Sequence, residues 1–347
     1  MPRNHPLKRN WNNPNKQGFS TKIAWTNKES FTLKKTLAAA LALATALTLT
    51  GCSTASPSQQ MFDTLKSSCG TFKTGKDVSK VKVSTDLKKA PTVDFMTPID
   101  SAKPTLQTSV VVEGSGPKIT GGQFVTWEYA VFSGIDKSQI TATKFDGTDS
   151  PQQMIPATGD LCKALAGVRE GSRIALLVPS EVAGTSATGE VSSQVWVFDI
   201  KRVFLPHAVG DVKSPENGMP IVNRATDGRP AVTIPKGEAA TKFKRSVILE
   251  GKGDVVKNGQ QILVHYSGYL WNGTVFDSSW EAGQPQTFTV DNQHLIPGFV
   301  KALTGVKVGS QVVAVIPPEL AYGEAGNGSI PGNSTLVFVV DVLGIVK

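Results

Sequence analysis

The alternation of side chains along residues 261–277 predicts a β-hairpin. Ile262, Val264 and Tyr266 recur at every second position, which is the period of a strand. Asn272-Gly273 follows as a strong two-residue turn signal, because both residues tolerate positive φ. We therefore expect the chain to reverse there and to return as a second strand that ends near the isolated acid Asp277.

The pattern changes to a helical period over residues 296–305, with Pro297 in the first turn and Gly305 at the C-terminal end. Two further apolar strands are expected at 311–316 and 334–343. One short helix against a largely antiparallel sheet is an α+β arrangement.

An internal repeat organises the chain into two domains. Residues 109–123 (SVVVEGSGPKITGGQ) match residues 246–260 (SVILEGKGDVVKNGQ), and the match continues through the later strands. The predicted copies cover residues 76–205 and 231–347. The segment between them, 206–230, is polar and rich in turn residues, and is expected to be an exposed linker.

A leader precedes the repeat. Lys34 and Lys35 are followed by an apolar stretch that is short for a membrane span and ends in Leu49-Thr50-Gly51-Cys52. This pattern resembles a bacterial lipobox, in which the peptide is cut before the cysteine and the cysteine sulfur is acylated. We expect residues 33–51 to be a lipoprotein signal peptide, and residues 52–75 to be lipidated Cys52 and a flexible tether.

Residues 1–32 fit this leader poorly, because they are polar and rich in Asn and Lys. They are expected to be a mis-assigned extension upstream of a true start at Leu33, or a disordered leader. Mass spectrometry of the protein from cells checks both expectations. Peptides from residues 1–32 would contradict the start at Leu33, and an unmodified Cys52 would contradict the lipid anchor.

The net charge of +8 does not indicate nucleic-acid binding. Eight of the 36 Lys and Arg residues precede Cys52, against one of the 28 acids, so the remainder carries only about +1. The basic balance therefore belongs to the leader, and we expect no nucleic-acid partner.

Two cysteines remain after Cys52, namely Cys69 and Cys162. Outside the cytoplasm an even number suits one disulfide, but two unpaired core residues fit the sequence equally well. No His or Cys cluster has the spacing of metal ligands. His265 and His294 are expected to be ordinary strand or surface residues.

The second copy resembles the FKBP-type peptidyl-prolyl cis–trans isomerases. The resemblance rests on HYSGYLWNGTVFDSS, LIPGFVKALTGVKVGS, IPPELAYG and IPGNSTLVFVVDV, which occur in family order and spacing over residues 246–347. It implies two tandem FKBP-like domains, each a curved antiparallel β-sheet wrapped around a short α-helix. It also implies a catalyst that needs no metal or cofactor.

The same resemblance implies the site residues. The catalytic positions are Tyr266, Phe276, Asp277, Ile296, Phe299, Tyr322 and Phe338. The further substrate-binding positions are Leu295, Ile330 and Phe288. Ala282 and Gln286 depart from the family, which often has an arginine and an aromatic residue there, so affinity for FK506-like macrolide inhibitors is an open question.

The first copy keeps only part of this set. Tyr129 matches Tyr266 and Trp196 matches Phe338, whereas Phe145-Asp146 echoes Phe276-Asp277 only after an insertion. We expect the first copy to have the same fold with a degraded pocket. Its role could be to bind unfolded chains, to position the second copy, to bind a partner or to act as a spacer.

Two functions follow. One is a prolyl isomerase held by its lipid at the membrane of the bacterial cell envelope, facing outside the cytoplasm and acting on proline-containing exported polypeptides. The alternative is a non-catalytic lipoprotein chaperone or adhesin that binds apolar or proline-containing segments.

Overall fold

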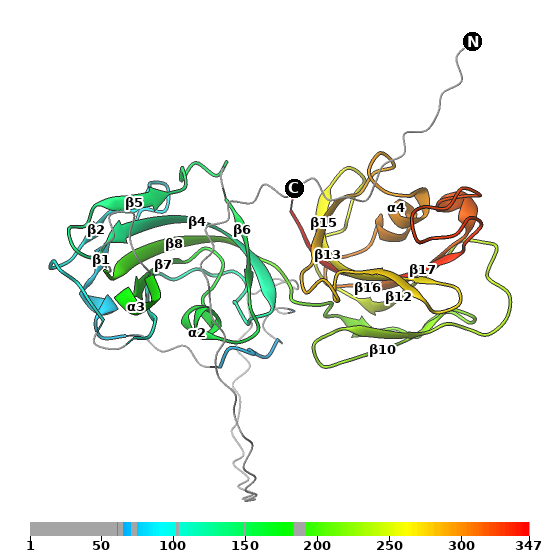
Figure 1. Ribbon diagram of the computed structural model, residues 1–347, viewed down its shortest axis with the longest axis horizontal. Coiled ribbons are helices and arrows are strands. Elements are labelled where there is room, and N and C mark those ends of the chain that lie inside the picture. The colour runs from blue at the N-terminus through cyan, green and yellow to red at the C-terminus, as the bar shows by residue number, and fades with distance from the viewer. Residues whose placement is uncertain are drawn as a thin grey trace, which may run out of the picture. The chain divides into compact units, whose positions relative to one another are not determined.

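Two large antiparallel sheets and two short hairpins dominate the structure (Figure 1). The computed structural model describes residues 61, 65–70, 75–101, 104–148, 150–183 and 192–346. Cys52, the apolar leader and the polar segment directly after Cys52 lie outside the described residues. Among the described helices, none is long and apolar enough to span a bilayer.

The first sheet has six strands. In spatial order they are β3 (Gln107–Val112), β7 (Arg173–Val178), β8 (Gln194–Val203), β4 (Gln123–Ser133) and β5 (Gln139–Ala142), with β6 (Gln152–Ile155) also paired to β4. Its helices are α2 (Asp160–Leu165) and α3 (Ser180–Ala183). A 3₁₀ turn, η1 (Val78–Lys80), and a short hairpin, β1 (Lys82–Val83) with β2 (Val93–Asp94), precede it.

The second sheet repeats this order. Its strands are β12 (Lys244–Glu250), β16 (Gln311–Ile316), β17 (Leu336–Ile345), β13 (Gln261–Leu270) and β14 (Val275–Ser278), with β15 (Gln286–Thr289) also paired to β13 and β9 (Asp211–Val212) added beside β12. Its short helical elements are α4 (Pro297–Leu303) and η2 (Pro318–Leu320), and its hairpin is β10 (Ile221–Arg224) with β11 (Pro230–Thr233). The prediction of antiparallel strands with a short helix is confirmed.

The central strands of the second sheet are buried on both faces. On one face, residues such as Tyr266, Phe338 and Val340 pack with α4 in a shared core. On the other face, alternate residues of β16 and β17 pack against Met219 and the β10–β11 hairpin. Long apolar runs such as QVVAVI need a cover on each face, and α4 and the hairpin are these covers.

The expected linker is therefore wrong in part. Residues 206–230 include β9, β10 and the first residue of β11, and they belong to the second sheet and its hairpin. Their polarity misled the prediction, because β10 is an edge hairpin whose outward side chains face solvent. The missing signal was the second apolar face of β16 and β17, which required a covering element.

A buried aspartate lies at matching positions in the last strands of the two sheets. Asp199 on β8 pairs with Arg173 at 2.6 Å, and both side chains are almost completely buried. The Arg173 guanidinium also donates to the carbonyl oxygens of Ser84, Asp86 and Lys89. The guanidinium of Arg173 thus pairs with Asp199 inside the first sheet and also joins that sheet to the segment between β1 and β2.

In the second sheet the corresponding aspartate, Asp341, forms no ion pair with any residue that the structure describes. Asp341 accepts hydrogen bonds from the N–H of Ala208 at 2.8 Å and from the side-chain amide of Gln311 at 2.7 Å. Burial raises the pKa of Asp341 to about 6, although these two donors act in the opposite direction. Asp341 therefore anchors the segment after β8 at an electrostatic cost when it is ionised.

A disulfide joins the two remaining cysteines. It links Cys69 to Cys162 of α2, across 93 residues of sequence. The pair lies in a small buried cluster with Ala166. Cys69 falls within residues 52–75, which were predicted to be a flexible tether, and that prediction is wrong at this position because the disulfide holds the buried Cys69 against the helix of the first sheet.

Replacing Asp341 with Asn tests the cost of this buried carboxyl. A folded-state pKa above the ordinary 3.8 gives stability that is fully present below pH 3.8 and is lost as the pH rises through about 6. Asp341→Asn has no such titration, and its amide can donate to the Gln311 Oε1, which has no hydrogen-bond partner among the described residues. In urea unfolding, the stability of the variant relative to wild type should rise between pH 4 and pH 7, by up to about 3 kcal/mol. A difference that does not change with pH would contradict this account.

Candidate active site

Strand β13 and its turn position the first site residues. Gly273 adopts a φ of 89°, and its N–H donates to the Leu270 carbonyl, which closes the turn predicted at Asn272-Gly273. The chain returns as β14, and the pairing places Gly268 opposite Asp277. This register brings Asp277 beside Tyr266, two residues earlier on the facing strand.

Tyr266 donates a hydrogen bond from its phenolic hydroxyl to a carboxylate oxygen of Asp277. The tyrosine is buried, whereas Asp277 is exposed. Burial, together with the hydrogen bond to Asp277, raises the pKa of Tyr266 far above its usual value. The hydroxyl therefore stays protonated and remains a donor, and the carboxylate is fixed at the edge of an apolar surface.

Five aromatic rings form a continuous cluster around this hydrogen bond. Phe299 lies at its centre, with ring-centroid distances of 4.9 Å to Phe338, 5.8 Å to Phe288 and 6.5 Å to Tyr266. Phe276 reaches Phe338 at 5.5 Å. Most of these pairs meet edge to face, the arrangement that the ring quadrupole favours. We call these five residues the aromatic site.

The aromatic site combines residues from five elements, namely β13, β14, β15, α4 and β17. Phe299 and Phe338 are buried, while Phe276 and Phe288 are only partly buried. The rings of Phe276 and Phe288 therefore offer apolar surface to a ligand, above a floor formed by Phe299.

The start of α4 supplies a polar group next to this floor. Ile296 is the residue before the first helical turn, and Pro297 follows it. No acceptor for the Ile296 N–H occurs within the described part of the chain. A helix N-terminus with a free N–H suits a carbonyl oxygen of a bound peptide.

The remaining predicted residues also reach this region. Leu295 and Ile330 are buried in the same core, and Tyr322 packs against it while partly exposed. The structure thus brings nine of the ten residues predicted for the pocket to one core, and the exposed Asp277 reaches its edge through the hydrogen bond with Tyr266. Of the other predicted positions, Cys69 and Cys162 form the disulfide elsewhere, and Cys52 lies outside the described residues.

The two histidines differ in their surroundings. His294 is exposed and contacts Asp291 at 2.6 Å, whereas His265 is buried at 5% exposure. No group of three or more metal-ligating side chains occurs among the residues that the structure describes.

Gly268 was missed by the sequence reasoning. A Cβ atom at this position would lie 2.5 Å from the Phe276 ring and 3.0 Å from the Phe338 ring. The glycine therefore makes room for two rings of the aromatic site. A glycine inside a strand is the signal that marks such a close approach.

Strand pairing shows how the first sheet differs. Trp196 pairs with Val131 as Phe338 pairs with Gly268, so the predicted match of Trp196 to Phe338 is confirmed. Thr141 pairs with Val131 in the first sheet, just as Asp277 pairs with Gly268 in the second. Thr141 therefore occupies the position of Asp277.

The proposed echo of Asp277 at Phe145-Asp146 is therefore wrong, because those residues lie beyond the end of β5. The first sheet has a branched side chain in place of Gly268 and a hydroxyl in place of the carboxylate.

The comparisons with known proteins agree with this geometry. A family model described as FKBP-type peptidyl-prolyl cis-trans isomerase matches residues 253–343. An FK506-binding protein from Streptomyces anulatus is 38% identical over 120 residues, which are 34% of this chain and 97% of that protein. The chain belongs to the FKBP-type peptidyl-prolyl cis–trans isomerase family.

Longer members of the family match over part of their length. FkpA from Escherichia coli (strain K12) is 42% identical over 107 residues, which are 31% of this chain and 39% of that protein. A solved structure of FkpA from Escherichia coli aligns with a TM-score of 0.29 and 37% identity, covering 38% of this chain and 52% of that one. The chain thus spans about two fifths of the length of the curated FkpA relative.

Substituting Gly268 tests whether the spacing of the two rings matters. Gly268→Val introduces the residue found at position 131 and should displace Phe276, the more exposed of the two rings. We expect at least a tenfold loss of prolyl isomerase kcat/KM in a protease-coupled assay, because the displaced ring would no longer meet a bound proline. The matched change in the first sheet, Val131→Gly, should leave kcat/KM unchanged. Full activity of a folded Gly268→Val protein would contradict this role.

Proposed function

We propose that the second sheet catalyses cis–trans isomerisation of Xaa-Pro bonds at the aromatic site. The observation that carries the proposal is the Tyr266–Asp277 hydrogen bond at the edge of five clustered rings. Membership of the isomerase family supports it.

The chemistry needs an apolar surface rather than a nucleophile. Rotation about an Xaa-Pro bond breaks amide resonance, with a barrier of about 18–20 kcal/mol. The twisted amide is less charge-separated than the planar one, so an apolar site favours it over the ground state. This is differential binding of the transition state, and it lowers the barrier without a covalent step.

Each site residue has a role in this proposal. Phe299 lies beneath the proline ring, and Tyr266, Phe276 and Phe338 form walls around it. The Ile296 N–H and the Tyr322 hydroxyl donate hydrogen bonds to substrate carbonyl groups. Asp277 provides a fixed negative charge near the rotating amide, and no residue transfers a proton.

The location of the enzyme is part of the proposal. Cys52 carries a lipid that holds the protein at the membrane of the cell envelope, outside the cytoplasm. Its substrates are proline-containing exported polypeptides, whose folding is slow wherever an Xaa-Pro bond must isomerise. The Cys69–Cys162 disulfide is compatible with this oxidising environment.

The first sheet supports a second, non-catalytic role. The rings of Trp127, Tyr129 and Trp196 gather around Phe198, at distances of 4.5–6.3 Å. Tyr129 and Trp196 are only partly buried. A domain with these rings but with Thr141 in place of Asp277 suits binding of apolar or proline-containing segments without turnover.

Affinity for FK506-like macrolides is also proposed. The name of the Streptomyces relative indicates such binding for that protein. Here Ala282 and Gln286 occupy the sequence positions at which charged and aromatic residues are common in the family. Binding is therefore expected to be weaker than in family members that have both.

A protease-coupled assay of Xaa-Pro isomerisation on the full chain tests the proposed function. Asp277→Ala should lower kcat/KM about tenfold, since one charge-assisted hydrogen bond contributes about 1.4 kcal/mol. Tyr322→Phe should lower it severalfold, because one donor to the substrate is lost.

Thr141→Ala is the matched control in the first sheet, because Thr141 occupies the place of Asp277, and it should retain full activity. A folded wild-type chain whose rate equals the uncatalysed rate would reject the enzyme and favour the binding protein.

A further inference from the structure

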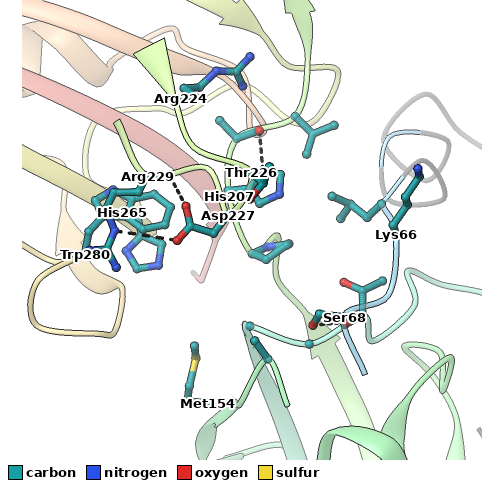
Figure 2. A pocket seen from close by; sticks show the side chains of 18 of the residues that line it. Lys66, Ser68, Met154, His207, Arg224, Thr226, Asp227, Arg229, His265 and Trp280 are labelled. Carbon is teal, nitrogen blue, oxygen red and sulfur yellow. Dashed lines mark hydrogen bonds and ion pairs between the residues drawn. The ribbon is translucent and has the colours of Figure 1, made fainter. Parts of the chain in front are cut away.

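His265 immediately precedes Tyr266 in the sequence of β13, so the two side chains point to opposite faces of the strand. Its imidazole stacks on the Trp280 indole, with ring centroids 3.9 Å apart and planes inclined by 17°. Figure 2 shows this pair beside Asp227 and Arg229, at the edge of a cleft of about 600 Å³. His265 is not part of the aromatic site, but the stacking on Trp280 fixes the position of its imidazole.

Among the residues that the structure describes, the imidazole has one hydrogen-bond partner. Nδ1 of His265 lies 2.9 Å from the hydroxyl oxygen of Ser279, which is also buried. The same oxygen accepts the backbone N–H of Tyr266 at 2.8 Å and lies 3.2 Å from the Tyr266 carbonyl oxygen. Ser279 is thus the connection between the imidazole and the backbone of Tyr266.

The bonding capacity of a hydroxyl allows two arrangements of these contacts. Serine offers one donor and two acceptor positions. The Ser279 oxygen accepts the Tyr266 N–H, and its own proton goes either to the Tyr266 carbonyl, which also accepts the Ser279 backbone N–H, or to Nδ1 of His265. Neutral His265 takes part in both arrangements, as a donor in the first and as an acceptor in the second.

The surroundings keep His265 neutral. Burial lowers the pKa of His265 to about 4, and electrostatic interactions with His207 and Arg229 act in the same direction. Asp227 opposes them, and Asp341 lies across from His265 on β17. At neutral pH the imidazole is therefore an uncharged hydrogen-bond partner of Ser279.

Ser279 lies where this contact affects the site. Strand β14 ends at Ser278, so regular pairing with β13 stops one residue before Ser279. Beyond that point, the Ser279 backbone N–H and its side chain bond to Tyr266. Because Asp277 is only two residues earlier, this connection sets how the carboxylate meets the Tyr266 hydroxyl.

The first sheet provides an internal comparison. Thr143 occupies the position of Ser279, and its hydroxyl accepts the N–H of Tyr129 at 3.0 Å. Glu128 occupies the position of His265, but it pairs with Lys201 and accepts the Gly147 N–H instead. The hydroxyl connection therefore occurs in both sheets, while the imidazole occurs only where the tyrosine has a carboxylate partner.

We propose that His265 is a positioning residue for isomerisation, which acts through the Ser279 hydroxyl to orient Tyr266 toward Asp277. This inference rests on the proposed function. It extends that function to His265 on the far face of β13 and to Ser279 just beyond β14, neither of which is among the residues proposed to touch the substrate.

Two pairs of variants of the full chain test this role. His265→Leu and Ser279→Ala each remove one partner of the hydrogen bond between these two side chains. His265→Asn and Ser279→Thr keep a polar group at the same place, and the threonine copies Thr143. We expect the first pair to lower kcat about fivefold to twentyfold with KM changed less than twofold, because a misdirected hydroxyl weakens the twisted state more than binding. The second pair should remain within threefold of wild type.

Thr143→Ala is the matched control, because it removes the same hydroxyl connection from the first sheet. It should lower the melting temperature and leave kcat unchanged. Wild-type kcat in folded His265→Leu or Ser279→Ala, or an equal fall in Thr143→Ala, would overturn the proposal. If His265→Leu does not fold, the Ser279 pair decides.

A second readout separates this proposal from the proposed function. The hydroxyl proton of Tyr266, held by Asp277, should give a downfield proton resonance. That resonance should shift or broaden in Ser279→Ala and return in Ser279→Thr. A wild-type chain without turnover would reject the proposed function, whereas an unchanged resonance in Ser279→Ala would reject the positioning role.

Discussion

The hydrogen bond from Tyr266 to Asp277 is the interaction on which the rest of the site depends. It needs β13 and β14 in one register, which the turn at Gly273 provides. It also needs a buried tyrosine, and the cover of α4 on one face of the sheet provides the burial. Because burial raises the pKa of Tyr266, its hydroxyl remains a donor, and the exposed carboxylate is held at the edge of the apolar surface.

Two copies of one architecture show which features belong to the fold and which belong to the site. Both sheets have the same strand order, a buried aspartate in the last strand and a hydroxyl that binds the backbone of the matching tyrosine. Only the second sheet combines Gly268, Asp277 and His265. These three differences lie on adjacent strands, which indicates that the site depends on local substitutions in a shared framework.

The sequence predicted the hairpin and the short helix, because strand alternation and turn chemistry are local signals. The ten pocket residues came from the resemblance to the isomerase family, and their roles stay a prediction. It did not predict that residues 206–230 cover the second sheet, since that role depends on an apolar face formed by distant strands. It also missed Gly268 and the pair His265–Ser279. A glycine inside a strand is a local signal that marks the close approach at Gly268. The His265–Ser279 contact has no such signal, because it joins β13 to the residue after β14 and neither a histidine nor a serine identifies such a contact by itself.

Exchange spectroscopy by NMR on an Xaa-Pro peptide, with substoichiometric full-length protein, tests the central claim most directly. The account predicts accelerated exchange between the cis and trans peptide signals. It also predicts amide shift changes in the protein at Tyr266, Asp277, Ile296 and Phe299. Peptide binding without accelerated exchange, or shift changes confined to the first sheet around Tyr129, would contradict it.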